Sequence, residues 1–547
     1  MEIDGGSKSR RSDGGEAIAS GGYGCVFRPA ISCKGETKPR SDSISKLMRK
    51  DKAEDEMEEI EEALKLVKRI PNYSKYFALT NYHMCVPGKI TKEDQKSFIE
   101  QCINPLGVTS NEVKKHPSDY RLVVSPDLGT DLSKSLKSMF TRARDDKPGS
   151  AGYQHLIRNL INLNNTSYDF LKNGIAKMAK VGLYHADVKP QNVMTNYNRD
   201  LAKPSFTEMK LIDYGLVLPP GPDAAHSINS FVMFNAPFSM FMFGWEVKDD
   251  INRLLATEAH VYEEDKVNQG GNQNRYERRI SEGMERIIND HVFSYSRDHI
   301  PYMETIGGRA FGISTAKYRS SFRNVFIDYC TVVVLDFTDR TDKKRPRFNA
   351  VKYWEDVLQY NLDVWGFLTS FLLLASYSQI THPSISDDYL SIVSNYLYTP
   401  VYATRRIPVG EVLAALDEIT SRFQKQIGLP APVPAVAPVP VEAAPVKKIV
   451  VKPKKATKTK KKRLVIVKEF KSAEERPARS VVTLKSNQKR CPKGYVRHKK
   501  DKTKCVKSGT KTKKVVKEGI TLVGKRCPKG YKRHKTEKGR CVANTKK

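Results

Sequence analysis

The stretch YHADVKPQNVM, residues 184–194, places a carboxylate, an ammonium group and an amide at short, fixed offsets. Asp187, Lys189 and Asn192 follow one another as D-x-K-x-x-N. A carboxylate can take a hydroxyl proton, a lysine can neutralise charge that builds on a phosphoryl group, and an amide oxygen is a ligand for a hard cation such as Mg²⁺. The spacing therefore predicts a loop for phosphoryl transfer, with Asp187 as base, Lys189 on the phosphoryl group and Asn192 on the metal.

A second carboxylate lies in MKLIDYGLVL, residues 209–218, where a strand pattern runs into a glycine turn. A carboxylate at the end of a strand, beside a glycine that allows a sharp turn, is well placed to hold a cation against phosphates. We therefore expect Asp213 to hold the Mg²⁺ that bridges the phosphates of a nucleotide.

A glycine cluster, ASGGYGCV, occupies residues 19–26. Glycine lets a backbone cover a triphosphate closely, because any Cβ would block that approach. The cluster fits G-x-G-x-x-G-x-V, with an alanine in place of the first glycine. Alone it would fit a flexible turn equally well, and the motifs that follow it give it weight. The residues expected to contact a nucleotide are Ala19, Gly21, Gly22, Tyr23, Gly24 and Val26.

The segment SISKLM, residues 43–48, is a strand candidate that carries Lys46, the expected partner of the α and β phosphates. In the next segment, 52–70, apolar residues recur at positions 57, 60, 64 and 67, which predicts an amphipathic helix that ends at Pro71. That helix offers Glu56 as an ion-pair partner for Lys46. Glu59 is the alternative, and the sequence favours Glu56.

These five motifs, taken in order, resemble the eukaryotic-type protein kinase superfamily over residues 18–429. The resemblance implies a bilobal α+β fold, ATP and Mg²⁺ as cofactors, and transfer to a protein hydroxyl. The combination of Asp187 and Lys189 is similar to the serine/threonine form of the loop. The segment FNAPFS, residues 234–239, resembles the end of an activation loop, and DVWG, residues 363–366, resembles a core helix in which Asp363 braces the catalytic loop.

Three residues depart from the family pattern. Ala19 replaces the first glycine, Tyr214 replaces a phenylalanine, and Ala186 stands where many kinases have an arginine that pairs with a phosphorylated activation loop. The third departure predicts activity without such phosphorylation. Two rival functions remain: a small-molecule phosphotransferase, which commonly lacks the Lys189 and Pro190 combination, and a catalytically silent kinase-fold scaffold or virion protein.

The formal net charge of +33 is concentrated at the C-terminal end, where residues 430–547 hold 38 Lys and Arg against 7 Asp and Glu. The first 429 residues are therefore close to neutral. A basic unit is repeated at an offset of 36 residues, as RCPKGYVRHKKDKTKCV (490–506) and RCPKGYKRHKTEKGRCV (526–542). Residues 447–547 are expected to bind nucleic acid or another polyanion. The alternative is a solubilising or targeting tail.

Each repeat has two cysteines and a histidine, so a four-ligand zinc site would need an outside ligand or the second repeat. Small hairpins closed by a cysteine pair, or basic adaptors with free thiols, are the other interpretations. The five cysteines before residue 430 are scattered, and no secretory signal is visible. This pattern favours reduced thiols in a cytosol-like compartment. The apolar run FLTSFLLLA, 367–375, is too short for a bilayer and predicts a buried helix, so no membrane partner is expected.

The expected organisation has five parts. They are a disordered N-terminus (1–16), an N-lobe with hinge (17–129), a C-lobe (130–429) with an inserted subdomain (244–350), a Pro-rich and then Lys-rich linker (430–488), and two basic repeats (489–547). The repeats, the Pro-Ala-Val linker and the SKLM and FNAPFS variants resemble the divergent kinases of large double-stranded DNA viruses of algae. That resemblance implies a viral enzyme of the host cytoplasm or nucleus, or one packaged in the virion, and not a secreted protein.

Overall fold

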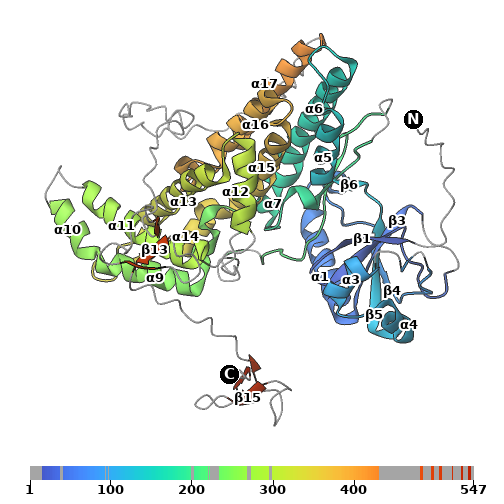
Figure 1. Cartoon of the computed structure of the whole chain (residues 1–547), viewed down its shortest axis with the longest axis horizontal. Coiled ribbons are helices and arrows are strands. Elements are labelled where there is room, and N and C mark those ends of the chain that lie inside the picture. Colours follow the sequence, from blue (N-terminus) through green and yellow to red (C-terminus); the bar gives the residue numbers. More distant parts are fainter. Residues whose placement is uncertain are drawn as a thin grey trace, which may run out of the picture. The chain divides into compact units, whose positions relative to one another are not determined.

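The computed structural model describes residues 15–36, 41–92, 94–95, 98–198, 203–219, 221, 224, 233–267, 273–294 and 299–429, together with six short strands near the C-terminus. The chain divides into two compact units, Met1–Lys455 and Ala456–Lys547. The first unit has a sheet-rich N-terminal region and a helical C-terminal part, an α+β architecture (Figure 1). Of the expected disordered segment, residues 1–14 lie outside the described residues, and Glu16 already begins the first strand.

The N-terminal region is built on a five-stranded antiparallel sheet in the order β1-β2-β3-β5-β4. Its strands are β1 (Glu16–Ser20), β2 (Gly24–Arg28), β3 (Ser43–Arg49), β4 (His83–Cys85) and β5 (Tyr120–Pro126). Its helices are α1 (Lys50–Val67), α2 (Tyr73–Tyr76), α3 (Phe98–Leu106), α4 (Ser110–Lys115) and the short η1 (Pro117–Asp119). Thr109 caps α4 through a reciprocal pair of hydrogen bonds with Glu112, which fixes where this helix begins.

Both faces of this sheet are buried, because successive side chains of a strand point to opposite sides. On β3, Leu47 packs with Cys25, Phe27 and residues of α3, whereas the next residue, Met48, packs with Ala53 of α1. Helix α1 therefore covers one face, and α3 with α4 covers the other. Figure 1 shows these three helices around the sheet. Lys46 has the same parity as Met48, so the lysine points toward α1.

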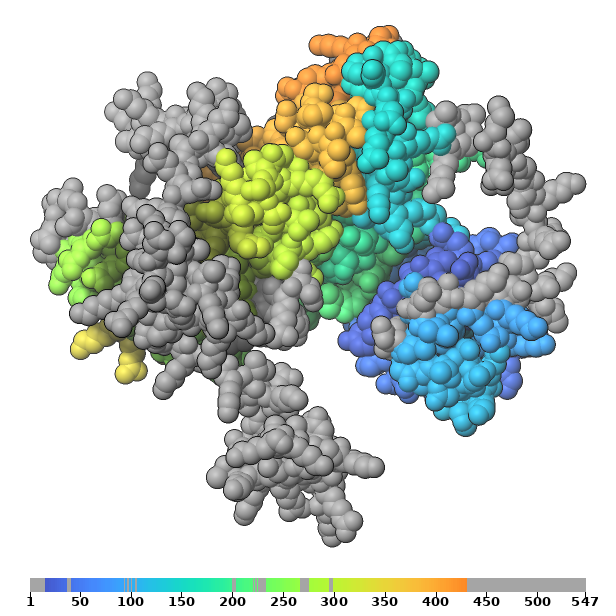
Figure 2. All heavy atoms as spheres, viewed as in Figure 1, coloured from blue at the N-terminus to red at the C-terminus, as the bar shows by residue number. Residues whose placement is uncertain are grey.

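The C-terminal part consists mainly of helices. Its helical elements are α5 (Leu132–Arg142), α6 (Ala151–Asp169), η2 (Phe170–Ile175), α7 (Ala176–Val181), η3 (Pro190–Asn192), η4 (Phe238–Phe243), α9 (Trp245–Thr257), α10 (Ala259–Val267), α11 (Gln273–Ile288), η5 (Asn289–Phe293), α12 (His299–Ala310), α13 (Thr315–Asp336), α14 (Ala350–Tyr353), η6 (Trp354–Leu358), α15 (Gln359–Ser378), α16 (Pro383–Tyr396), η7 (Pro400–Tyr402) and α17 (Val409–Gln426). Its strands are β6 (Thr130–Asp131), β7 (Val193–Thr195), β8 (Met209–Leu211), β9 (Thr338–Asp339) and β10 (Arg347–Phe348). Helices α6 and α17 lie side by side (Figure 2).

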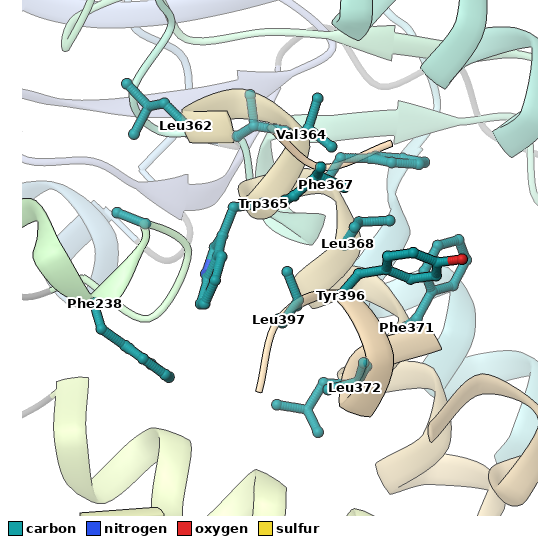
Figure 3. Packing of buried hydrophobic residues seen from close by; sticks show 14 of the residues in the cluster. Phe238, Leu362, Val364, Trp365, Phe367, Leu368, Phe371, Leu372, Tyr396 and Leu397 are labelled. Atoms are coloured by element: carbon teal, nitrogen blue, oxygen red, sulfur yellow. The ribbon is translucent and has the colours of Figure 1, made fainter. Parts of the chain in front are cut away.

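Helix α15 is the centre of this part, and it contains the apolar run predicted to be a buried helix. Figure 3 shows its residues Trp365, Phe367, Leu368 and Phe371 among the other members of one hydrophobic cluster. The continuous helical run Ala350–Ser378 is long and apolar enough to cross a membrane by length and composition alone, but 89% of its most apolar window is buried inside the structure. Its apolar character is therefore accounted for by core packing.

The segment 244–350 does not form a core of its own. Phe326 and Tyr329 of α13 lie against Phe238, with ring centroids 4.7 and 5.5 Å apart, and Phe238 also contacts Trp365 of α15 at 5.1 Å. All four residues belong to the main hydrophobic cluster. The predicted insertion 244–350 therefore packs against the helical core and shares its hydrophobic cluster. Aromatic side chains on α13 pack the segment against the core. The charged and glycine-rich loops of the segment gave no sequence signal of this packing.

The cysteines of the N-terminal region are paired, so the expectation of reduced thiols is wrong there. Cys25 is bonded to Cys102 and Cys33 to Cys85, with Cα atoms 5.2 and 5.8 Å apart. The partners are separated by 77 and 52 positions in the chain, and only the sheet and α3 bring them together. Cys330 is the one free cysteine within residues 15–429 as described, and it is buried.

The second unit contains two small antiparallel sheets, one for each repeat. Their strands are β11 (Val481–Thr483), β12 (Tyr495–Arg497) and β13 (Lys504–Lys507), then β14 (Ile520–Thr521), β15 (Tyr531–Arg533) and β16 (Arg540–Ala543). Strands β12 and β13 pair in antiparallel orientation, as do β15 and β16. Strand β11 completes the first sheet, so the expected boundary at residue 489 cuts through it. Cys491 and Cys527 lie outside the described residues.

Candidate active site

The D-x-K-x-x-N loop lies between α7 and a small sheet of β6, β7 and β8. Strand β7 pairs with both of its neighbours, and Ile212 N donates to Asn192 O at 3.0 Å, so the loop and the strand that leads to Asp213 are held side by side. Ala186 adopts φ of +59°, a left-handed conformation that is unfavourable for alanine. The surrounding contacts therefore hold this loop in a conformation that alanine would not choose on its own.

Three side chains converge on the buried carboxylate of Asp187. Lys189 Nζ lies 2.6 Å from Oδ2, Asn192 Nδ2 donates to Oδ2 at 2.9 Å, and Asn235 Nδ2 donates to Oδ1 at 3.0 Å. Asn192 Nδ2 also donates to the backbone carbonyl of Asp187 at 3.0 Å. Both carboxylate oxygens are thus oriented by donors, and the lysine ammonium lies beside Oδ2.

Asn235 had no predicted role of its own and appeared only within FNAPFS. It lies 48 residues from Asp187 in the chain and also donates to Val188 O at 3.2 Å. The glycine of α15 makes this approach possible, because a Cβ on Gly366 would stand 2.4 Å from Val188 O and 2.9 Å from Asn235 O. The sequence signals were the FNAPFS motif and the glycine of DVWG, but neither specified a contact with Asp187.

Asp363 of α15 holds the backbone of the D-x-K-x-x-N loop by hydrogen bonds, as the resemblance implied. Its Oδ2 accepts the backbone N–H of His185 at 3.0 Å, and its Oδ1 accepts that of Ala186 at 2.9 Å. The carboxyl is 5% exposed. Burial raises its pKa to about 7, and the two backbone donors partly oppose that shift.

His185 is fully buried, and its two ring nitrogens serve two different backbone groups. Nε2 lies 3.1 Å from Ile212 O, and Nδ1 accepts from Asp187 N at 3.3 Å, a pattern that requires the neutral ring with its proton on Nε2. Desolvation lowers its pKa, which favours the same neutral form. The ring packs edge-on against Tyr214 at 5.1 Å, and Tyr214 Oη donates to Leu211 O at 3.1 Å. The tyrosine thus uses its extra hydroxyl within the core.

Lys46 forms its ion pair with Glu56, at 2.5 Å between Nζ and Oε2, and both side chains are about one fifth exposed. Glu59, the alternative partner, lies one turn further along α1 and is half-buried. Burial raises the pKa of the Glu59 carboxyl, and the negative charges of Glu56 and Asp213 raise it further. Glu59 therefore lies close enough to Glu56, Lys46 and Asp213 to feel their charges.

The glycine cluster forms the turn between β1 and β2. Gly21 N donates to Gly24 O at 2.8 Å, and the Cβ position of Gly21 is 3.9 Å from Lys46 Cε, so this turn lies over the lysine. Gly24 is needed for a different reason than expected, since its Cβ would stand 2.5 Å from Leu47 O of the neighbouring strand. Ala19 pairs with Val26 across the turn. Tyr23 is 63% exposed and beneath Lys52 rather than within the site.

Asp213 follows β8 and has φ of +66°, a second strained residue beside the loop. The carboxylate of Asp213 and the side-chain amide oxygen of Asn192 are the kinds of oxygen that Mg²⁺ prefers. Asn192 uses its Nδ2 on Asp187, which leaves Oδ1 as the atom suited to a cation. The two expected ligands are joined through the hydrogen bond between Ile212 and Asn192. Their donor set fits Mg²⁺.

Comparisons with known proteins add little to this geometry. No protein-family model matches the chain, and no curated protein matches it. Among solved structures 186 chains match, and one of them is the crystal structure of the BubR1 kinase domain, with 15% identity and a TM-score of 0.23. That match covers 43% of this chain and 57% of the BubR1 chain, less than two thirds of its length. A similarity this low supports no argument about fold or activity.

Proposed function

We propose that this chain is an ATP- and Mg²⁺-dependent protein kinase that phosphorylates serine and threonine. The observation that carries the proposal is the arrangement around Asp187, whose carboxylate is oriented by Lys189, Asn192 and Asn235. Two of these donors come from the loop of Asp187 itself and the third comes from a segment 48 residues away, so both carboxylate oxygens are held in one orientation. Such an arrangement suits a group that must meet a substrate hydroxyl in one fixed orientation.

In this proposal each group has one task. Asp187 orients the hydroxyl and accepts its proton at a carboxylate oxygen, while Lys189 balances negative charge on the group being transferred. Lys46, held by Glu56 and covered by the turn of Gly21–Gly24, would supply the positive charge that binds the α and β phosphates of ATP. Asn192 and Asp213 would hold Mg²⁺, which supplies charge neutralisation between the phosphates. His185 and Asp363 keep the loop in its strained conformation and do not touch the substrate.

The direct test is transfer of labelled phosphate from ATP and Mg²⁺ to a basic protein substrate by the full-length chain. The wild type is compared with Asp187→Ala and with Asp356→Asn, which changes an exposed aspartate of η6 whose carboxylate forms a surface ion pair with Lys352. We expect label on serine and threonine, a loss of at least roughly 10³-fold in Asp187→Ala, and no loss in Asp356→Asn. Phosphatase treatment of the wild type should leave its rate unchanged, since Ala186 replaces the arginine that would read activation-loop phosphate.

A folded wild type that transfers no more phosphate than Asp187→Ala would reject the kinase proposal. The chain would then be a scaffold in which the same contacts only stabilise the fold. Transfer to a small metabolite instead of protein would favour the phosphotransferase alternative.

We further propose that residues 447–547 bind nucleic acid through phosphate contacts. Support comes from the excess of 31 positive charges over residues 430–547, the difference between 38 basic and 7 acidic residues. Affinity for random-sequence DNA should fall steeply with salt, because bound lysines release counterions. No binding at low salt would exclude this role. We also propose that the chain is of viral origin and acts in the host cytoplasm or nucleus, or in the virion; fractionation of infected cells and of purified particles tests where it acts.

A further inference from the structure

A cluster of metal-binding atoms lies in the N-terminal region, outside the site described above. Cys33, His83 and Cys85 each offer one ligand atom, and the three atoms lie within 4.8 Å of one another. His83 and Cys85 are two residues apart on β4, so their side chains share one face of the strand. It is the one such group of histidine, cysteine or acidic side chains among the residues that the structure describes.

The backbone holds the two sulfurs close together independently of the bond between them. Lys34 N donates to Val86 O at 2.9 Å and Gly88 N to Ser32 O at 2.8 Å, so the segments on either side of the two cysteines are paired. A Cβ on Gly88 would stand 2.7 Å from Ser32 O, which shows how closely the two backbones approach. These hydrogen bonds do not involve the sulfur atoms, so they would keep the two thiols adjacent if the Cys33–Cys85 disulfide were reduced.

Two thiolates and one imidazole form a donor set that Zn²⁺ prefers. Sulfur atoms about 2.3 Å from a tetrahedral zinc lie roughly 3.8 Å apart, a separation that rotation of the two cysteine side chains can supply. His83 Nε2 already lies 4.0 Å from Cys33 Sγ. Glu36, whose Oε2 accepts from Cys33 N at 3.1 Å, is on the adjoining loop, and its carboxylate or a water molecule would complete the four ligands.

We propose that Cys33, His83 and Cys85 form a zinc site when the two thiols are reduced, and that the zinc form and the disulfide form are alternative states of one redox-sensitive site. A dithiol reductant transfers two electrons and two protons to the disulfide and becomes a disulfide itself. Zn²⁺ then binds the two sulfurs and displaces their two protons. The proposal does not depend on kinase activity.

The Cys25–Cys102 disulfide of the same N-terminal region differs from the Cys33–Cys85 pair in its surroundings. Cys25 and Cys102 are both 0% exposed, and they belong to no group of three ligands among the described residues. Cys33 is 8% exposed, and His83 and Cys85 are partly exposed, so a cation and a reductant can reach that site. Only the Cys33–Cys85 pair therefore combines access with a third ligand.

The test measures zinc bound by the full-length chain after reduction with a dithiol and removal of excess reductant. Because the tail has its own cysteines and histidines, the result is read as a difference between wild type and variants. We expect Cys85→Ser and His83→Gln to bind one zinc fewer per chain, or to bind it at least roughly 10-fold more weakly. His116→Gln, which changes an exposed histidine of the same lobe, should match the wild type. Cobalt in place of zinc should show thiolate charge-transfer absorption that both site variants lose.

Oxidation by a small disulfide should release one zinc more per chain from the wild type than from Cys85→Ser, because any zinc held by the tail is lost from both. Equal zinc binding by reduced wild type, His83→Gln and Cys85→Ser would overturn the proposal and leave an ordinary disulfide. His83→Gln keeps both cysteines, so the disulfide can still form and the protein can still fold. A folded His83→Gln variant therefore decides the question even if Cys85→Ser does not fold.

Discussion

Replacement of Asp363 by asparagine should lower activity while it removes a pH-dependent cost to stability. Asparagine keeps the shape of the side chain, but its NH₂ group would face the backbone N–H of either His185 or Ala186, both of which now donate to the carboxylate. A hydrogen bond to a charged group contributes about 1.5–3 kcal/mol. If that support is lost in the transition state, the rate of phosphate transfer should fall roughly 10- to 100-fold.

The free energy of unfolding of the wild type should fall as the pH rises, and that of Asp363→Asn should not. Because burial raises the folded-state pKa of Asp363 to about 7, the folded protein keeps this proton to a higher pH than the unfolded chain, whose carboxyl has the ordinary value of 3.8. The wild type therefore loses stability as the pH rises from about 4 to about 7. At about 1.4 kcal/mol per pKa unit, the loss is on the order of 4 kcal/mol. Asp363→Asn lacks this loss.

The assay is urea denaturation of wild type and Asp363→Asn at several pH values, with transfer rates measured near pH 7.5. Asp356→Asn is the matched control, because its exposed ion pair should contribute no more than about 1 kcal/mol and should not alter the slope between pH 4 and 7. Parallel stability curves for wild type and Asp363→Asn would refute the pKa argument. Unchanged transfer by Asp363→Asn would refute the bracing role.

Three other changes test separate contacts. Asn235→Ala should lower kcat roughly 10-fold or more with little change in KM for ATP. Asn235→Asp should lower kcat further, because a second carboxylate would face Asp187. Steady-state kinetics measures both variants, and kcat values equal to the wild type would contradict the contact. Gly366→Ala should destabilise the fold by about 1–3 kcal/mol, since its Cβ meets two backbone oxygens, whereas Gly410→Ala, which meets nothing within 4 Å on α17, should be neutral or stabilising in thermal unfolding. Cys102→Ala should cost about 4 kcal/mol for its separation of 77 residues, and the difference from wild type in urea should largely disappear after both are reduced.

Local spacing was informative wherever the interacting residues are neighbours in the chain. Asp187, Lys189 and Asn192 lie within six positions, so the D-x-K-x-x-N pattern was enough to place their groups together. Lys46 and Glu56 are ten residues apart, on a strand and the helix that follows it directly. The amphipathic pattern of α1 and the parity of β3 determine which way the two side chains point. The division into a sheet-rich region and a helical part follows from the same periodicities.

Helical periodicity did not by itself separate Glu56 from Glu59, because both acids lie toward the face that meets the sheet. The packing of α1 against β3 decides which acid pairs with Lys46. Glu56 forms the ion pair, and Glu59 lies toward Asp213. The pKa of Glu59 depends on burial, which periodicity does not measure. A carboxylate that was only a competitor in the sequence thus becomes part of the charged surroundings of Asp213.

The sequence by itself predicted which side chains meet in the candidate site, the order of the elements and the basic character of the tail, because these depend on composition and on contacts between near neighbours. Only the tertiary structure decided that Asn235 meets Asp187, that α13 belongs to the core, and that Cys33 meets Cys85 beside His83. These partners are tens of residues apart. Their contact depends on how helices and strands pack, and the spacing of residues along the chain carries no record of that packing.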